Sequence, residues 1–523
     1  MACNDPVCDP VHERIQNRMI HDARLLREKY LCDPHRPGFH FVVPEGVHAP
    51  VDPNGTIFWK GRYHLFYIYQ HEGRHLWGHV SSIDLIHWRH HVPALLPGGA
   101  DEGIFSGGAF IDNHGVPTIT YWGLGLGRTC GICMATSTDD HLDHWTKHPA
   151  NPVIRETSFG LTATTDTAGN ELVYGAADPS AIWTHDGRYY MLTGNLLVLM
   201  EYGQKRKQPE HLGDTLYLFV SDDLEHWTYL HRFYTSRREW TREFEDCMCP
   251  DFFPLPTSPD GGPPSDTYMN LFISHNLGCQ YYLGRYAADR FEPQQHGRMT
   301  WVDNEFFAPE SLLDARGRRI MWTWVFDRRS HAARVASGWS GELSLPRVLW
   351  LGEDGTLRMK APPELTVLRY NPRQSENLRV QAGSELMLQD IQDDSLELAV
   401  EFAPATSGVF GVKVCCSPDG QEQTVISYDA TNHTLNVDTR QSSLGEGAKA
   451  IESAPLHLPA GEGLSLRVFV DKSFVDVFAN DRQAVCRRIY PSRRDSLGVR
   501  LFGDVDIIVP RVEAWDMMPS NPY

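Results

Sequence analysis

Short apolar and aromatic runs separated by Gly, Asp and Asn turns fill the chain from about residue 40 to 351. Four of these runs read "YHLFYIY", "RYYMLTG", "DTLYLFVS" and "MNLFISH". Runs of this length between turn residues are typical of β-strands, and almost no helical periodicity interrupts them. The pattern predicts an all-β domain over 39–352.

The polar extension before it, residues 1–38, differs in pattern. Its apolar residues are spaced as on one face of a helix, and we expect that helix to span Val11 to Tyr30. It packs on the neighbouring domain or bridges two copies of the chain. The apolar residues are Ile15, Met19, Ile20, Leu25 and Leu26.

A weak repeat divides the β-rich region. The segments "SSIDLIHW" (81–88), "STDDHLDHW" (137–145) and "SDDLEHW" (221–227) share a Ser, an acidic turn and a terminal His-Trp pair. Each follows strand-like sequence, as expected for repeats of one four-stranded unit, so we predict a β-propeller. We expect the His-Trp pairs to cap or pack turns rather than to bind a ligand.

After "GELSLPRVLWLGEDGTLRMKAPPEL" (341–365), the pattern changes to strict alternation. The runs "LELAVEFAPA", "LSLRVFVDKSFVDVFAND" and "DSLGVRLFGD" place apolar residues at every second position. Strands with one buried face read this way, so we expect a C-terminal β-sandwich over 366–523.

Charge and cysteine content narrow the choice of partners. The net charge of -19 disfavours nucleic acid or an anionic membrane, because both require a basic face. No apolar run approaches about 18 residues, which argues against a transmembrane span. The start has no signal-peptide pattern, and eleven Cys without framework spacing suggest reduced thiols. We therefore expect a cytoplasmic protein.

Acidic residues at strand starts are the candidates for chemistry. Asp52 precedes the first propeller strand, Asp178 precedes "AIWTHDGRYYMLTG", and three further acids precede "CMCPDFFPL". First strands of propeller blades line the central channel, so these side chains would converge there. Two converging carboxylates suffice for glycoside hydrolysis, and nearby aromatic residues could stack on sugar rings. The three further acids are Glu243, Glu245 and Asp246.

Other chemistries find little support in the sequence. We find no P-loop, dinucleotide-binding glycine pattern, zinc-protease helix or serine nucleophile elbow. The C-x-C pair in "DCMCPDFF" is spaced more closely than zinc thiolates usually are. We expect no metal and no cofactor.

These motifs together resemble glycoside hydrolase family 32, the invertase, inulinase and levanase family, across about 40–523. The matching segments, in order, are "VDPNG", "FSG" (105–107), "ADP" (177–179), "EDCMCPDFF", "WSGELSLPRVL" (339–349) and "VFVDKSFVDVFAND" (468–481). The resemblance implies a five-bladed propeller followed by a β-sandwich, in agreement with the strand pattern.

The resemblance also implies roles for individual residues. Asp52 would be the nucleophile that forms a fructosyl-enzyme, and Asp178 would hold sugar hydroxyls and stabilise the oxocarbenium-like transition state. Glu245 would protonate the leaving oxygen and then activate water, with a pKa raised by burial. The expected substrate-binding residues are Asn54, Trp77, Phe105 and Ser106.

The identity of the acid stays open at this point. Strict alignment on "CPDFF" places Met248 at the glutamate position, and alignment on the first Cys gives Asp246. A short bulge would give Glu245, which we prefer because its longer side chain can cross a displaced backbone. Glu243 is a further alternative.

Three departures from the family pattern fall in the sugar pocket. Val51, Ile68 and Ala177 stand where the motifs usually carry Asn, Gln and Arg. A site that loses hydrogen-bonding groups for a hydroxyl loses affinity for it, so these replacements bear on the substrate.

We therefore expect a retaining hydrolase of β-fructofuranosidic bonds in sucrose or small fructooligosaccharides. The alternatives are a fructosyltransferase with the same mechanism, a hydrolase of another furanoside, and a non-catalytic carbohydrate-binding relative. The expected partner is a small neutral sugar, and a homo-oligomer is left open.

Overall fold

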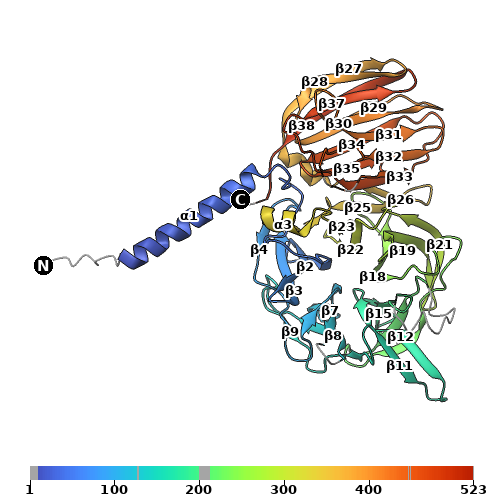
Figure 1. Ribbon diagram of the computed structural model, residues 1–523. Helices are drawn as coiled ribbons and strands as arrows, with labels where there is room; N and C mark the ends of the chain where they lie inside the picture. The colour runs from blue at the N-terminus through green and yellow to red at the C-terminus, as the bar shows by residue number, and fades with distance from the viewer. Residues whose placement is uncertain (1–9, 126–128, 200–212, 446, 448, 522–523) are drawn as a thin grey trace.

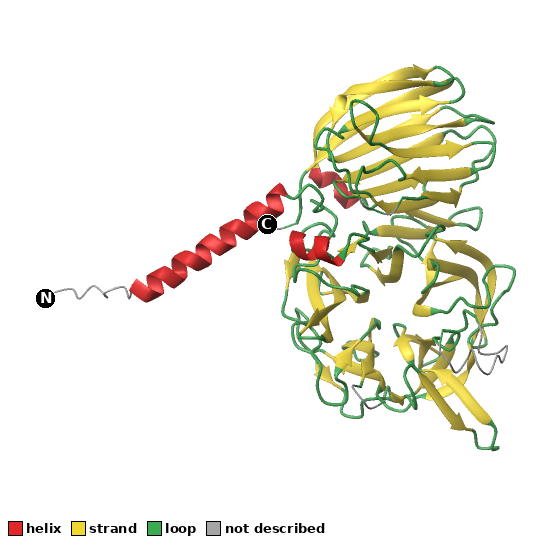
Figure 2. Cartoon of the chain, viewed as in Figure 1, coloured by secondary structure: helices red, strands yellow, loops and turns green. Residues whose placement is uncertain are grey.

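The computed structural model describes residues 10–125, 129–199, 213–445, 447 and 449–521. A β-propeller and a β-sandwich lie side by side, and one long helix extends away from both (Figures 1 and 2). The predicted all-β fold, with a five-bladed propeller, a sandwich and a helical extension, is confirmed. Among the described residues, no helix is long and apolar enough to cross a membrane.

The helix α1 (Pro10–Cys32) is slightly longer than predicted. Met19, Ile20 and Leu25 are at least half exposed, so these apolar residues do not pack on the propeller. The end of the helix is anchored to the propeller, where the Tyr30 hydroxyl donates to the Gly338 carbonyl at 3.1 Å.

The propeller strands form five antiparallel sheets around a central channel. Their bounds are as follows: β1 (Pro53–Trp59), β2 (Arg62–His71), β3 (Arg74–Ser82) and β4 (Trp88–His90); β5 (Gly103–Ile104), β6 (Ala109–Ile111), β7 (Pro117–Leu124), β8 (Gly131–Thr136), β9 (Thr146–Lys147) and β10 (Ile154–Arg155); β13 (Ala177–Pro179), β14 (Trp183–His185), β15 (Arg188–Gly194), β16 (Tyr217–Ser221) and β17 (Thr228–Arg232); β18 (Met248–Pro256), β19 (Pro264–Ser274), β20 (Gly278–Ala287) and β21 (Arg290–Arg298); β22 (Phe306–Leu313), β23 (Arg319–Val325), β24 (Glu342–Leu343), β25 (Arg347–Leu351) and β26 (Leu357–Lys360). 

Three smaller elements complete this half of the chain. A separate hairpin lies between the second and third sheets, a short helix lies in the last blade, and a 3-10 helix leads into the sandwich. These are β11 (Leu161–Thr165) with β12 (Glu171–Gly175), α3 (His331–Ser337) and η2 (Pro363–Leu368).

The sandwich packs two six-stranded sheets over one apolar core. Strand β26 still belongs to the last propeller sheet, so that sheet extends beyond residue 352. The sandwich strands are β27 (Arg369–Val380), β28 (Ser384–Gln392), β29 (Ser395–Phe402), β30 (Val409–Cys416), β31 (Thr424–Asp429), β32 (Thr434–Asp438), β33 (Ile451–Pro455), β34 (Leu464–Asp471), β35 (Phe474–Ala479), β36 (Gln483–Arg488), β37 (Gly498–Gly503) and β38 (Ile507–Met517).

The repeated His-Trp segments form turns, as the sequence suggested. In two of them the imidazole binds the acidic residue of its own turn at 2.8 Å, as His226 does with Asp223. The Trp227 indole donates to the carbonyl of Leu224, which has a positive φ of 67°. These contacts tie neighbouring strands of a blade together far from the channel.

A buried ionic cluster joins the entry segment of the propeller to the sandwich. His40 Nδ1 lies 2.9 Å from Asp471 and Nε2 lies 3.1 Å from Asp476, and all three side chains are fully buried. Burial lowers the pKa of His40, but the two carboxylates raise it further, so the net shift is upward. Burial raises the pKa values of both aspartates, but His40, together with Arg347 beside Asp476 and the Gly38 N–H on Asp471, lowers them further, so both lie below 3.8.

We expect His40→Ala to lower the free energy of unfolding by about 3 kcal/mol, because it removes the imidazole that lies between two buried carboxylates. Asp471 keeps its backbone N–H donors and Asp476 keeps Arg347, so neither carboxylate is left without any partner. The stabilisation from His40 is complete below pH 6.5 and is lost as pH rises through its raised folded pKa. That from the aspartates is complete above pH 3.8 and is lost as pH falls through their lowered pKa values. Urea unfolding of both proteins at pH 6 and pH 9 checks this. An equal difference at both pH values would contradict a charged His40.

Candidate active site

The first strands of four blades present bulges to the central channel. The register shifts in β1, β13, β18 and β22, and three residues at these bulges have positive φ: Asp178 (39°), Cys249 (48°) and Ala308 (49°). A non-glycine residue in this conformation costs about 1–3 kcal/mol and often marks a functional site. The bulges turn side chains toward one point in the channel.

That point is a cavity of about 180 Å³ that contains both predicted strand-start acids. Asp52 enters from the segment before β1, and Asp178 enters from β13. The walls are mostly aromatic and apolar, with one thiol and one imidazole. The remaining lining residues are Phe105, Trp122, Phe159, Leu196, Met248, Cys249, Ile273, His275 and Phe307.

One carboxylate oxygen of Asp52 is hydrogen-bonded to the protein, and the other has no partner among the described residues. Its Oδ2 accepts a hydrogen bond from Ser106 Oγ at 2.8 Å, and its carbonyl oxygen accepts from Asn54 Nδ2 at 2.6 Å. Burial raises the pKa of Asp52 to about 6, against the opposing effects of Ser106 and the positive charge of His275. A carboxylate with this pKa is ionised at neutral pH.

Asp178 has a similar environment. Burial and the negative charge of Asp52 raise its pKa to about 7, while His275 and Cys249 act in the opposite direction. Its Oδ2 accepts from the Cys249 thiol at 3.4 Å. Within the described part of the chain, neither Asp52 Oδ1 nor Asp178 Oδ1 has a hydrogen-bond partner. Both oxygens are therefore free to accept hydrogen bonds from a sugar or to attack one.

The "FSG" segment supports Asp52 through close backbone packing. Gly107 donates its N–H to Asn54 Oδ1 at 3.1 Å, and a Cβ at Gly107 would lie 2.0 Å from the Thr120 carbonyl oxygen. Only glycine permits this approach, which places Ser106 on the nucleophile candidate.

The predicted binding residues divide into two groups. Phe105 lines the cavity, as expected. Trp77 and Asn54 are buried behind it; the Trp77 indole donates to the Phe105 carbonyl at 3.0 Å, and Asn54 bridges Asp52 and Gly107. They position the residues that face the cavity, and so does Ser106.

Glu245 is not brought to this cavity. Its carboxylate binds Arg298 Nη2 at 2.9 Å and Gln280 Nε2 at 2.9 Å, and it is fully buried in that cluster. Glu243 is exposed. Asp246 is buried and accepts from His275, whereas Met248 lines the cavity, as strict alignment of the motif indicated.

The three replaced polar positions lie in apolar packing around the site. Val51 packs with the first and last blades, Ile68 packs with the first and second, and Ala177 lies beside Trp122 and Met248. None of the three lines the cavity. The polar groups that face the cavity are therefore those of the two aspartates, Cys249 and His275, set among aromatic and apolar walls.

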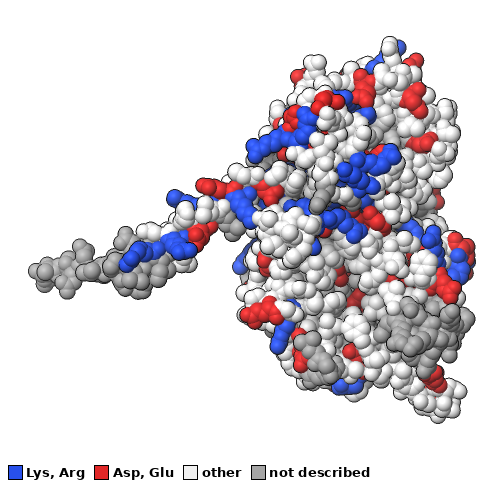
Figure 3. All heavy atoms as spheres, in the orientation of Figure 1, with Lys and Arg blue, Asp and Glu red and all other residues white. Residues whose placement is uncertain are grey.

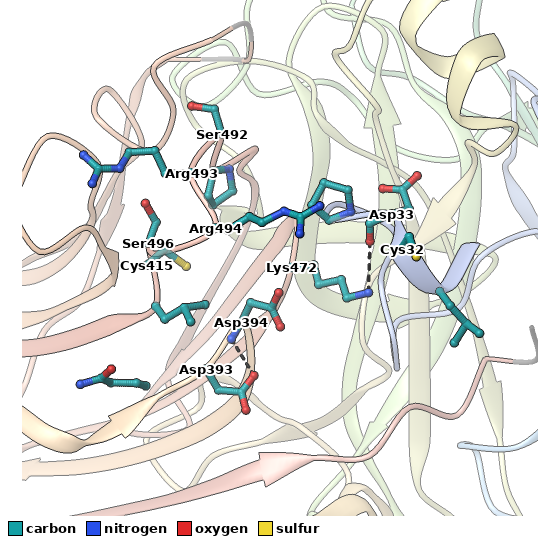
Figure 4. A pocket seen from close by; sticks show the side chains of 15 residues that line it. Cys32, Asp33, Asp393, Asp394, Cys415, Lys472, Ser492, Arg493, Arg494 and Ser496 are labelled. Carbon is teal, nitrogen blue, oxygen red and sulfur yellow. Dashed lines mark hydrogen bonds between the residues drawn. The ribbon is translucent and has the colours of Figure 1, made fainter. Parts of the chain in front are cut away.

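Two other places could attract ligands. Figure 4 shows a cavity of about 600 Å³ between the end of α1 and the sandwich, where Lys472 Nζ lies 3.3 Å from the Asp33 carbonyl. It contains none of the predicted site residues. His79, His91 and Asp143 bring metal-ligating atoms within 4.8 Å of one another in the described chain, and His91 is hydrogen-bonded to Asp143 at 2.6 Å.

Surface charge gives no second indication of a binding face in the view shown. Acidic and basic side chains are interspersed over both domains (Figure 3). Two buried carboxylates that face one cavity with aromatic walls are compatible with glycoside hydrolysis, which uses paired carboxyl groups at the scissile bond.

Comparison with known proteins defines the family. Residues 40–362 match the model of the glycosyl hydrolases family 32 N-terminal domain, and residues 364–516 match that of the family 32 C terminal. The chain belongs to glycoside hydrolase family 32. The resemblance predicted from the motifs is therefore confirmed, and the protein is an enzyme with the fructosidase activity of this family.

Individual proteins of this family are similar to the chain over most of its length. A levanase of Bacillus subtilis is 28% identical over 96% of this chain and 74% of its own length. A sucrose-6-phosphate hydrolase of Zymomonas mobilis is 29% identical over 94% of each chain. The structure of fructan 1-exohydrolase IIa from Cichorium intybus superposes with a TM-score of 0.78 at 24% identity, over 93% of this chain and 98% of that one. A further structure of that exohydrolase contains 1-kestose.

Proposed function

We propose that this enzyme releases terminal fructose from sucrose or small fructooligosaccharides with retention of configuration. The observation that carries the proposal is the pair of buried aspartates, each with one unpartnered oxygen, in a single aromatic cavity. Asp52 supplies the nucleophile that a retaining reaction requires, and Asp178 supplies a second carboxylate beside the same sugar.

The size of the cavity supports a small substrate. Its volume of about 180 Å³ is below the roughly 300–1,000 Å³ of pockets that enclose drug-sized ligands. It holds one sugar ring, with the rest of the substrate outside. In the reaction, Asp52 Oδ1 attacks the anomeric carbon as the leaving oxygen departs, and water then cleaves the resulting ester.

Asp178 is assigned the role of a transition-state stabiliser. Its free Oδ1 accepts hydrogen bonds from ring hydroxyls, and these strengthen as positive charge develops on the sugar. The aromatic walls exclude water and stack on the apolar face of the ring.

Product analysis with sucrose, 1-kestose, levanbiose, inulin and aryl furanosides tests this proposal. We expect free fructose from sucrose and 1-kestose, at higher kcat/KM than from inulin. Transfer products at high sucrose would favour the fructosyltransferase. Release of sugar only from another furanoside would favour a hydrolase of that furanoside, and binding without turnover would favour the carbohydrate-binding relative.

The cytoplasmic location stays a prediction, which cell fractionation would test. The oligomeric state stays open, and light scattering would determine it.

Ser106→Ala is expected to move the acidic limb of the kcat/KM profile to higher pH by about one unit. The Ser106 hydrogen bond lowers the pKa of Asp52, so its loss raises that pKa above about 6, and a bond to a charged group contributes about 1.5–3 kcal/mol. Steady-state kinetics from pH 4 to 9 check this. Ser137→Ala, which removes a buried serine from a turn, is the control. An unmoved limb would show that Asp52 does not set it.

A further inference from the structure

The cavity contains no third carboxylate among the described residues that line it. Met248, at the strict motif position, cannot transfer a proton, and Glu245 is engaged by Arg298 and Gln280. Hydrolysis nevertheless needs a group that protonates the leaving oxygen and later accepts a proton from water. Besides the two aspartates, the lining residues offer only Cys249 and His275 for this task.

His275 is placed by a neighbouring strand and fixed by a buried acid. It follows β19 directly, and its Nδ1 lies 2.6 Å from Asp246 Oδ2. Its backbone N–H donates to the other oxygen of Asp246 at 2.8 Å. Asp246 is fully buried and accepts from Ser274 as well, so it cannot move away from the ring.

This arrangement determines which ring nitrogen is available. With Nδ1–H donated to Asp246, Nε2 is the ring nitrogen that remains for proton transfer, and His275 lines the cavity together with Asp52 and Asp178. The side chain is 44% exposed, so the ring can exchange protons with solvent between turnovers. Phe307 packs edge-on against it at 5.6 Å, and Asn304 holds its carbonyl.

The charges around His275 favour its protonated form. Burial lowers its pKa, but the hydrogen bond and charge of Asp246, together with the charges of Asp178 and Asp52, raise it above 6.5 overall. These three acids come from three different blades. Cys249 is less suitable as a proton donor because burial raises the pKa of its thiol well above 9 and its hydrogen already points to Asp178.

We propose that His275, oriented by Asp246, is the general acid and base of this enzyme, in place of a glutamate. The inference rests on the proposed function, with Asp52 as nucleophile. In the first step, Asp52 Oδ1 bonds to the anomeric carbon, the carbon–oxygen bond to the leaving group breaks, and its electron pair takes the proton from Nε2.

The second step restores the site. Water attacks the anomeric carbon and gives its proton to the now neutral Nε2, while the ester bond breaks and its electron pair returns to Asp52. Protons and electrons balance, and water is the only co-reactant. Asp246 keeps its hydrogen bond to Nδ1 throughout and stabilises the imidazolium, as the acid of a catalytic triad does.

The test compares His275→Gln with the wild type on two substrates. Sucrose has a poor leaving group that needs protonation, whereas an aryl β-fructofuranoside with a nitrophenolate leaving group does not. We expect kcat/KM for sucrose to fall by about 10²–10⁴-fold, and that for the aryl fructoside by less than about 10-fold. Azide, which attacks the intermediate without a base, should restore kcat on the aryl substrate.

His226→Gln is the matched control, since it removes another His–Asp hydrogen bond of 2.8 Å from an exposed turn. It should behave as wild type on both substrates. Equal losses on both substrates in His275→Gln, without azide rescue, would show a merely structural role and overturn the inference. So would a leaving-group dependence that appears in Asp178→Asn and not in His275→Gln, because Asp178 would then be the acid.

The wild type provides a measurement that does not depend on a folded variant. Its kcat/KM for sucrose should fall at alkaline pH as His275 loses its proton, and this limb should be absent for the aryl fructoside. An alkaline limb shared by both substrates would overturn the inference. If the wild type hydrolyses no fructoside at all, the proposed function fails first; if it hydrolyses sucrose and His275→Gln does so equally well, only the inference fails.

Discussion

Asp52→Asn should lower kcat for sucrose by about 10⁴-fold or more, which corresponds to at least ~5.5 kcal/mol of transition-state stabilisation. Asparagine keeps the shape of the side chain and can still accept from Ser106, so the loss reflects the missing nucleophile. Deamidation of the new asparagine would restore the wild-type aspartate and give false residual activity. It proceeds through a succinimide that needs the next backbone N–H, which Pro53 lacks, so this background is suppressed. Stopped assays of fructose release measure the loss.

Asp140→Asn is a suitable control, because Asp140 is exposed and only 3.7 Å from Lys60 at the surface. Its activity should match the wild type. In a companion variant, Asp52→Ala, azide should restore turnover on an aryl fructoside and give the fructosyl azide of inverted configuration. Wild-type activity in Asp52→Asn would remove Asp52 from the mechanism.

Asp178→Asn should lower kcat by about 10²–10³-fold, with a smaller rise in KM. The loss is smaller than at Asp52 because Asp178 forms no bond to the sugar but stabilises the charge that develops in the transition state. The variant also removes the group whose pKa is raised to about 7. The step that this group contributes to the pH profile should disappear, while the titration near 6 stays. Asp52, Asp178 and His275 interact electrostatically, so the pKa values read from the pH profile belong to the three groups together rather than to one residue each.

Asp186→Asn provides the comparison within the same blade. Asp186 lies at the tip of the β14–β15 hairpin, with 88% of its side chain exposed, and its removal should leave kcat unchanged. If Asp178→Asn raised KM and left kcat unchanged, Asp178 would bind the ground state and the transition state equally, contrary to its assigned role.

Much of this architecture could be predicted from the chain alone. Alternating strands and turn residues give the propeller and sandwich, because period-two patterning follows directly from strand geometry. The placing of Asp52 and Asp178 in one cavity could also be predicted, since each stands at the start of a blade's first strand, where the fold itself brings side chains to the channel. The "FSG" motif of the family resemblance predicts Phe105 as a pocket residue, and Phe105 lines the cavity.

The acid proposed here, His275, could not be predicted in this way. A bulge between Met248 and Asp251 decides which side chain of β18 faces the cavity, and a shift of one residue exchanges that face for the opposite one. Glu245 lies before the bulge and is taken up by Arg298, which is far away in sequence. His275 belongs to the end of a different strand, and only the pairing of β18 with β19 places it in the cavity.

The sequence also could not show where the three apolar replacements in the family motifs would lie. Val51, Ile68 and Ala177 replace hydrogen-bonding residues, but the structure buries them behind the cavity walls. In the proposed function, two unpartnered carboxylate oxygens and one imidazole of the cavity wall make the polar contacts to the sugar. The site is more apolar than the motifs suggested, which strengthens each remaining electrostatic interaction.

The most direct test of the account is the configuration of the first product formed in the presence of methanol. Methyl fructofuranosides do not change anomer in solution, so NMR of an early time point reports the stereochemistry of the enzymatic step. Displacement through a covalent intermediate on Asp52 predicts methyl β-fructofuranoside from sucrose, and none from Asp52→Asn. The methyl α-anomer, or wild-type yield from the variant, would contradict it.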